Sequence, residues 1–291
     1  MSLSLKPTET NIRTKYARPY IPNAVFYIPF AYYYAVRLGT LPKLLSWALI
    51  YLMPTAFYSA AGYSGSWGIF AINYFLILLA TFSLYEYGYI YNDTIAISRE
   101  EAPAIRLYEK NFAHFARRHW LILFVRLFTS VAALGVLYML NESNPHVPLV
   151  FAAVAVTGLF FAIYNRWRSL TNVWFYPLLV CARYVPFMVM YECSWTAYIL
   201  LFVSFPLLNA MERFSMPKYR WPLMRSLIPE ESAKTRFRVY YYALTLILAT
   251  LILYSRGESL FLLTPVLILF LYRLCLLFWL RTHKPTNYLN G

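Results

Sequence analysis

The stretch WGIFAINYFLILLATFSLYEYGYIYND, residues 67–93, decides the fold class. It is apolar and aromatic throughout, with Glu86 as its one charge before Asp93. An α-helix crosses the hydrocarbon core of a bilayer with about 20 such residues. A strand of a membrane β-barrel would instead alternate between apolar and polar residues over about 10 positions. We therefore expect a transmembrane α-helix over 67–91.

The composition extends this expectation to the whole chain. Of its 291 residues, 60% are hydrophobic, 20% are aromatic and only 13% are charged, and the mean hydropathy is +0.50. A soluble domain carries about 25% charged and 45–50% apolar residues. These values exclude a soluble enzyme, a disordered chain and a nucleic-acid binder. The net charge of +14 is then typical of a membrane protein with Lys and Arg gathered on its cytoplasmic face.

Further apolar stretches of similar length occur along the chain. The expected spans are 44–61, 67–91, 120–140, 147–164, 170–191, 195–211, 239–254 and 259–280. Segment 20–36 is also apolar, but Pro22 and Pro29 interrupt it, so we expect an interfacial or re-entrant segment there. The sequence thus predicts an all-α, polytopic transmembrane helical bundle of eight or nine spans. We expect one domain over 20–281, an N-terminal arm over 1–19 and a tail over 282–291.

The distribution of Lys and Arg predicts the orientation of this bundle. Of the 26 basic residues, 22 lie in the N-terminal stretch that ends at Lys43, in loop 92–119, in loop 212–238, in the turn after Tyr164 and in the tail. The other connections contain only Arg256. With eight spans, the positive-inside rule places both long loops and both termini in the cytoplasm. Because the arm has no apolar core, we expect no cleavable signal peptide, and we expect a bacterial plasma-membrane protein.

Both long loops begin with oxygen-bearing side chains that could bind a metal ion. The candidates in the first loop are Asn92, Asp93, Glu100 and Glu101; Asp93 is the only Asp in the chain. Asn209 and Glu212 are the candidates in the second loop, and their i, i+3 spacing places them on one helix face. Mg²⁺ prefers oxygen ligands, commonly one or two carboxylates together with substrate phosphates.

Basic residues follow these oxygen ligands in both loops. Arg and Lys are the side chains that bind phosphate oxygens, so we expect a phosphate-binding set. Its candidates are Arg99, Arg106, Lys110, Lys218 and Arg220. The alternative for either loop is a positive cytoplasmic loop with solvated acids and no site.

Four ionisable residues lie inside the expected spans, where such residues are candidates for function. Glu86 and Arg126 lie at similar depths in neighbouring spans, so we expect them to form an ion pair that holds two helices together. The alternative is that they form one wall of a polar cavity beneath the two loops. Arg183 lies in the middle of a span and needs a partner, which could be a phosphate, a polar acceptor or Glu86. We expect Arg273 to extend its side chain toward the cytoplasmic interface.

The order of these motifs resembles the UbiA superfamily of intramembrane prenyltransferases. The Asn92-Asp93 motif and the second polar motif correspond to the two metal-binding motifs of that family. The resemblance extends to Arg18-Pro19, to Pro103 and Arg106, and to Tyr176-Pro177 followed by Arg183 and Pro186. The chain departs from the family pattern where Ala96 and Glu100 replace the second and third Asp of motif one. Motif two contains no Asp.

The resemblance implies a Mg²⁺-dependent transferase that acts on an isoprenoid phosphate or diphosphate, with membrane lipid around it. Asp93 and Glu212 would be the catalytic ligands, and the prenyl group would pass to a small polar or aromatic acceptor. One alternative is phosphoribosyl transfer to a polyprenyl phosphate. Another is a non-catalytic protein that binds or carries a lipid phosphate, which the missing Asp residues favour.

Overall fold

The computed structural model describes residues 20–99, 105–166, 172–219 and 221–282. Within these ranges the chain is helical and contains no strand. In the described ranges, eight helical segments are long and apolar enough to span a membrane. They are Leu41–Ala61, Trp67–Thr94, Glu109–Leu140, Val147–Arg166, Val173–Met190, Trp195–Phe214, Ala233–Ser255 and Leu260–Thr282. The prediction of an all-α, multi-pass membrane protein is confirmed.

The spans are divided into shorter elements where the helix geometry changes. The α-helices are α1 (Ala31–Tyr33), α2 (Leu41–Trp47), α3 (Met53–Ala61), α4 (Trp67–Thr94), α5 (Glu109–Leu140), α6 (Val147–Arg166), α7 (Asn172–Ala182), α8 (Val185–Met190), α9 (Trp195–Phe202), α10 (Leu208–Phe214), α11 (Pro222–Leu227), α12 (Glu231–Ser255) and α13 (Thr264–Thr282). The 3₁₀ turns are η1 (Asn23–Phe26), η4 (Ala96–Arg99), η6 (Pro217–Tyr219) and η7 (Leu260–Leu263). The π-helical turns are η2 (Tyr34–Leu38), η3 (Ala48–Leu52) and η5 (Val203–Leu207).

Both long loops are shorter than the sequence predicts. The helix α4 continues to Thr94 and α5 already begins at Glu109, so the expected loop 92–119 is reduced to the stretch between them. The expected loop 212–238 likewise loses residues to α10 and α12. With 28 and 32 residues, α4 and α5 are about 42 and 48 Å long at 1.5 Å per residue. They exceed a hydrocarbon core of about 30 Å, so polar residues can continue the helix beyond it.

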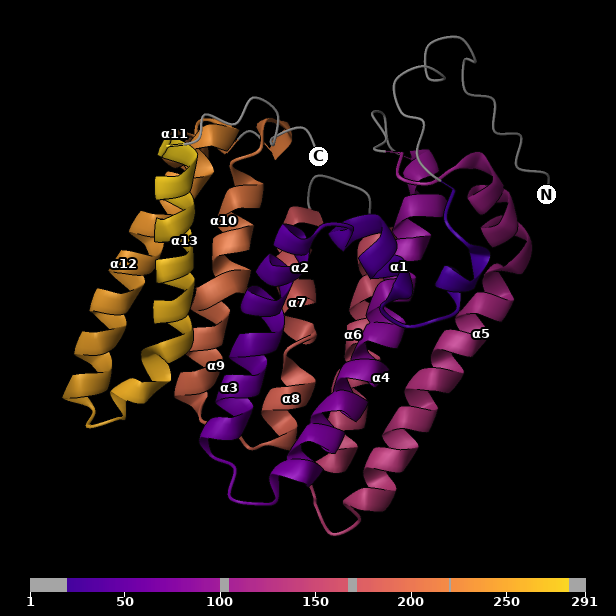
Figure 1. The fold of residues 1–291 in the computed structure, drawn as a ribbon, viewed down its shortest axis with the longest axis horizontal. Coiled ribbons are helices and arrows are strands. Elements are labelled where there is room, and N and C mark those ends of the chain that lie inside the picture. The colour runs from indigo at the N-terminus through magenta and orange to yellow at the C-terminus, as the bar shows by residue number, and fades with distance from the viewer. Residues whose placement is uncertain (1–19, 100–104, 167–171, 220, 283–291) are drawn as a thin grey trace.

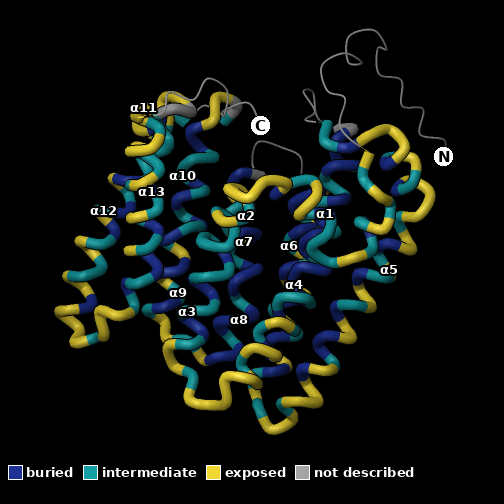
Figure 2. The backbone as a smooth tube through the Cα atoms, in the orientation of Figure 1, coloured by how far each residue is buried: buried dark blue, intermediate teal, exposed yellow. Residues whose placement is uncertain are grey.

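The helices stand side by side as one bundle (Figure 1). The span formed by α7 and α8 is the most buried of the eight, and the tube in Figure 2 is mostly dark blue or teal along it. The pair α12 and α13 forms one edge and α5 the other. The end of α4 and the end of α10 lie at the same end of the bundle, which we call the long-loop face.

The segment 20–38 is broken, as its two prolines predict. It forms η1, then α1 and η2. Phe30, which lies between η1 and α1, has a φ of 68°. A positive φ is unusual for a residue other than glycine and needs support from its surroundings. The carboxylate of Glu86 provides this support, because it accepts hydrogen bonds from the backbone N–H groups of Phe30 at 2.8 Å and Tyr33 at 2.5 Å.

Arg126 fixes the same segment on the other side of the break. It donates to the carbonyl oxygen of Phe26 at 2.9 Å and to that of Val25 at 3.4 Å. Its Nη1 lies 2.6 Å from Glu86 Oε2, and both side chains are fully buried. The expected ion pair is therefore confirmed, and it also anchors the broken segment against α4 and α5.

Candidate functional site

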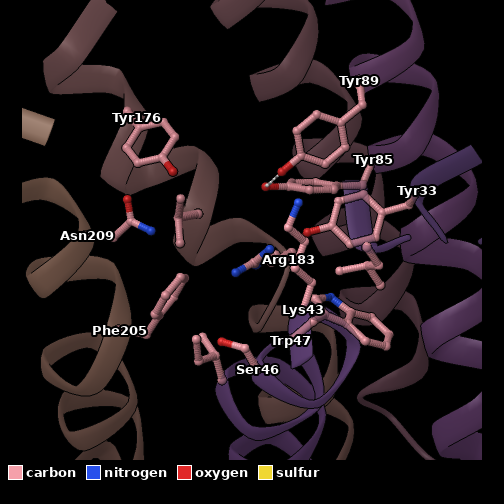
Figure 3. Close-up of a pocket in the computed structure, with 13 residues that line it drawn as sticks. Tyr33, Lys43, Ser46, Trp47, Tyr85, Tyr89, Tyr176, Arg183, Phe205 and Asn209 are labelled. Atoms are coloured by element: carbon pink, nitrogen blue, oxygen red, sulfur yellow. Dashed lines mark hydrogen bonds between the residues drawn. The ribbon is translucent and has the colours of Figure 1, made fainter. Parts of the chain in front are cut away.

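A cavity of about 280 Å³ opens between the central helices (Figure 3). Six aromatic side chains contribute to its wall: Tyr33, Trp47, Tyr85, Tyr89, Tyr176 and Phe205. Lys43 and Arg183 also line it, and no lining residue is acidic. The cavity is thus aromatic and positively charged.

Irregular helix geometry forms much of this wall. Each of the three π-helical turns contributes one residue: Leu38 from η2, Ile50 from η3 and Phe205 from η5. Arg183 comes from the short break between α7 and α8. Such turns are uncommon and often occur at functional sites. Four helices thus deviate from regular geometry where they meet the cavity.

Arg183 is the central charge of the cavity, and its side chain is only 5% exposed. Its guanidinium lies over the rings of Tyr51 at 4.8 Å, Tyr184 at 5.0 Å and Phe205 at 5.4 Å. Its Nη2 donates to the Tyr184 hydroxyl at 3.1 Å, while its Nε has no partner. In the described part of the chain, no carboxylate lies within 4.0 Å of it. Glu86, one of its expected partners, binds Arg126 instead.

Several polar groups face the cavity without a protein partner. Among the described residues, the Asn209 carboxamide and the hydroxyls of Tyr176 and Ser46 make no hydrogen bond. Figure 3 shows Asn209 and Tyr176 on one side of Arg183, and Tyr33, Tyr85 and Tyr89 on the other. Hydroxyl and amide groups can donate to an anion that occupies the space between them. These groups can therefore complete the coordination of a phosphate beside Arg183.

Arg213 lies behind one wall of the cavity. Its guanidinium stacks on the Tyr176 ring at 4.1 Å, and its Nη2 donates to the Tyr164 hydroxyl at 2.6 Å. It follows Asn209 by one helical turn on the same face of the α10 segment. Tyr176 therefore separates Arg213 from the cavity and is held in position by it.

Asp93 lies at the end of α4 in a separate cluster. Arg37 Nη2 is 2.6 Å from each of its carboxylate oxygens, and Arg106 Nη1 is 3.1 Å from Oδ1. The Tyr32 hydroxyl donates to Oδ2 at 3.0 Å, and Asn92 Nδ2 donates to Oδ1 at 3.2 Å. Asp93 is fully buried. It is therefore an internal counterion and not a solvated acid.

Two partners of Asp93 lie outside the spans, in the broken segment, and respond to its charge. Burial and the adjacent carboxylate raise the pKa of the Tyr32 hydroxyl well above its ordinary value. Burial alone would lower the pKa of the Arg37 guanidinium, but the Asp93 carboxylate beside it raises the pKa above the usual value. Tyr32 therefore remains protonated and Arg37 remains charged.

The second expected motif is divided between two environments. Asn209 lines the cavity, but Glu212 binds Arg238, with distances of 2.5 Å to Nε and 2.7 Å to Nη2. This is a two-point ion pair between α10 and α12. The i, i+3 spacing predicted that both residues share one helix face, but only Asn209 lines the cavity.

Of the remaining predicted residues, the structure describes the side chains of two. Arg106 belongs to the Asp93 cluster, while Lys110 is exposed near the start of α5. The side chains of Arg99 and Lys218 lie outside the described part of the structure, as do the whole residues Glu100, Glu101 and Arg220. The structure thus brings Arg183 and Asn209 together in one cavity and joins Asp93, Asn92 and Arg106 in another cluster.

The carboxylates of Asp93 and Glu212 are both already bound to other side chains. Asp93 is surrounded by five donor contacts, and both oxygens of Glu212 are bound to Arg238. Within the described ranges, no three His, Cys, Asp or Glu residues form a group that could hold a metal ion. The expected Mg²⁺ site, which also includes Glu100, stays a prediction from the sequence.

Sequence reasoning missed several residues of both clusters. Tyr33 and Arg37 lie in the broken segment, and Lys43 and Trp47 lie in α2. Arg37 and Lys43 belong to the basic N-terminal stretch, which the sequence assigns only to the cytoplasmic face. The break in the apolar segment could have indicated these residues, because irregular backbone at membrane depth is tolerated where it lines a cavity.

The arrangement can bind an anion with an apolar tail. Arg183 and the free polar groups suit a phosphate, and the aromatic wall suits a hydrocarbon chain. No protein-family model, curated protein or solved structure matches the chain.

Proposed function

We propose that this membrane protein binds the phosphate headgroup of an isoprenoid lipid in the cavity around Arg183. The observation that carries the proposal is the buried Arg183 guanidinium, which has an unpartnered Nε and no carboxylate within reach among the described residues. Burying a charge is costly unless a partner compensates it. A phosphate that enters the cavity would supply both the opposite charge and hydrogen-bond acceptors.

The aromatic wall supports an isoprenoid chain as the apolar part of this ligand. Tyr33, Tyr89 and Trp47 present ring faces and edges, and such surfaces pack well against unsaturated hydrocarbon. A free phosphate ion would make no contact with hydrocarbon on this aromatic surface. The resemblance to UbiA proteins independently favours an isoprenoid phosphate or diphosphate.

Transfer of the bound lipid's prenyl group is a second candidate function, as the UbiA resemblance implies. It is favoured by the position of the Asn92-Asp93 motif, because Tyr89 lies one helical turn before Asp93 and lines the cavity. In such a reaction the allylic C–O bond breaks and the acceptor bonds to the carbon. The electron pair remains on the leaving phosphate, where the fixed charge of Arg183 would stabilise it. Phosphoribosyl transfer to a polyprenyl phosphate would use the same charge.

The orientation of the bundle completes the proposal. Most basic residues of the sequence lie in the stretch that ends at Lys43, in the two expected loops, in the turn after Tyr164 and in the tail, and the positive-inside rule assigns these parts of the chain to the cytoplasm. Both termini would then be cytoplasmic, as would the Asn92-Asp93 motif and the second motif with Asn209 and Glu212. A plasma membrane of bacterial type remains part of this proposal.

Binding of farnesyl phosphate to the purified protein in lipid nanodiscs tests the proposed function. We expect saturable binding to the wild type and a loss of affinity of at least about tenfold in Arg183→Gln, since Arg183 holds the phosphate. Farnesol, which lacks the phosphate, should bind weakly to both. Arg166→Gln is the matched control, because Arg166 is exposed at the end of α6.

Two results would overturn the proposal. One is equal affinity of the wild type and Arg183→Gln for farnesyl phosphate. The other is equal affinity of the wild type for farnesyl phosphate and farnesol. Incubation of the bound lipid with candidate acceptors then separates the two functions, because release of inorganic phosphate or diphosphate would indicate transfer.

A further inference from the structure

The carboxylate of Asp93 has no unused acceptor position. A carboxylate offers about four lone-pair sites. Oδ1 receives contacts from Arg37, Arg106 and Asn92, and Oδ2 receives contacts from Arg37 and Tyr32. These five contacts fill the available sites. A metal ligand would have to give up several of them.

The geometry of a magnesium ion makes that exchange costly. Mg²⁺ requires near-octahedral oxygen ligands at 2.0–2.1 Å and usually keeps several water molecules. Asp93 is fully buried, so ion and water would need space that Tyr32 and Arg37 now fill. The ion would also lie beside two guanidinium groups, whose positive charges would repel it.

The Asp93 cluster itself carries positive charge. One carboxylate and the two guanidinium groups of Arg37 and Arg106 leave a net charge of +1. The Arg37 guanidinium also lies 4.8 Å from the centre of the Tyr89 ring, and Tyr89 lines the cavity. The Arg37 guanidinium is thus separated from the cavity by the Tyr89 ring alone, and its positive charge favours an anion in the cavity.

We infer that Asp93 is the shared counterion of Arg37 and Arg106, and that these guanidinium groups supply the positive charge beside the cavity without a divalent cation. Asp93 thereby joins the broken segment 20–38 to the stretch that leads into α5. Anion binding in the cavity depends on arginine and not on Mg²⁺. The part of this inference that concerns anion binding rests on the proposed function, whereas the role of Asp93 as a counterion does not.

The first experiment measures thermal unfolding of the ligand-free protein with MgCl₂ and with EDTA. We expect the same midpoint for the wild type in both buffers. Asp93→Asn should have a lower midpoint, again the same in both, because it leaves the two partly buried arginines Arg37 and Arg106 without their counterion. Glu109→Gln is the matched carboxylate control, since Glu109 is exposed at the start of α5. A midpoint that Mg²⁺ raises in the wild type but not in Asp93→Asn would overturn the inference.

A double variant keeps the test decisive if Asp93→Asn does not fold. Arg37→Gln combined with Asp93→Asn removes one charge of each sign. If Asp93 is the counterion of Arg37, more of the double variant than of Asp93→Asn should elute as a monodisperse folded species. Recovery no better than that of Asp93→Asn would contradict the pairing.

The second experiment measures farnesyl phosphate affinity of the wild type in the two buffers. We expect the dissociation constants to agree within about twofold, whereas a metal-dependent site should lose at least about tenfold in EDTA. A loss of that size would overturn metal independence and leave lipid-phosphate binding intact. Absence of binding in both buffers would instead contradict the proposed function, while the unfolding experiment would still decide the role of Asp93.

Discussion

The carboxylate of Glu86 accepts a hydrogen bond from the backbone N–H of Tyr33, a residue 53 positions earlier in the chain. Glu86 thereby fixes the start of the helical turn that carries Tyr33 into the cavity wall, where its ring stacks on Tyr89 with centroids 5.3 Å apart. The second carboxylate oxygen binds Arg126 and the N–H of Phe30. The buried ion pair and the shape of the cavity are therefore linked through backbone hydrogen bonds.

Exchange of Glu86 and Arg126 should not restore a folded protein. Breaking a buried pair costs about 3–5 kcal/mol. The exchange would preserve both charges, but an arginine at position 86 cannot accept from the N–H groups of Phe30 and Tyr33. Monodispersity in detergent should therefore be low for Glu86→Arg, for Arg126→Glu and for the double variant. Full recovery of the double variant would show that the charges alone matter.

Arg183→Met should raise the thermal midpoint of the ligand-free protein. The substitution removes a buried charge whose Nε lacks a partner, and replacing buried charge with apolar side chains of similar size is often stabilising by about 1–4 kcal/mol. Loss of the contacts with Tyr51 and Tyr184 offsets part of this gain. Arg166→Met serves as the exposed control. A midpoint several degrees below the wild type would identify Arg183 as a structural residue.

Tyr176→Phe should separate ligand binding from packing. The ring that stacks against Arg213 remains, while the hydroxyl that faces the cavity is lost. A hydrogen bond to a charged group contributes about 1.5–3 kcal/mol, so farnesyl phosphate affinity should fall by roughly 10- to 100-fold at unchanged stability. Tyr176→Ala should in addition lower the thermal midpoint, since it removes the ring. Unchanged affinity in Tyr176→Phe would place the phosphate elsewhere.

Cysteine labelling can establish the orientation of the bundle. Lys110→Cys and Ser226→Cys introduce exposed thiols near the long-loop face, and Glu142→Cys introduces one at the opposite end. In a background without the three native cysteines, a membrane-impermeant maleimide should label the first two only after the cytoplasmic side is opened. Glu142→Cys should react in intact cells. Labelling of Lys110→Cys and Ser226→Cys from different sides would contradict a common face.

The sequence predicted the features that depend on the length of an apolar stretch and on the position of charged residues within it. All eight spans were expected, because apolar stretches of about 20 residues have few other structures available. The pairing of Glu86 with Arg126 was also expected, since both charges lie at similar depth in neighbouring spans. The helix ends were predicted less well, because helices that leave the hydrocarbon continue through polar residues such as Asn92.

The partners of the remaining charges depend on tertiary packing, which the sequence does not reveal. Arg37 binds Asp93 only because the segment after Phe30 turns back toward the end of α4. Arg273 is 6% exposed and lies 4.8 Å from the Tyr272 ring, and its extension toward the interface stays a prediction. Arg183 and Asn209 were identified, but no periodicity indicated that the rings around them would enclose a cavity.

The three π-helical turns have a consequence for how such a cavity can originate. A π turn contains one more residue than the α-helical turn that it replaces, so each corresponds to a single inserted residue. Deletion of one residue from η3 or η5 would return that span to regular geometry and rotate the following half-helix by about 100°. The cavity wall could thus have been acquired from a closed bundle through single-codon insertions, each of which turned existing side chains inward without the need for new ones.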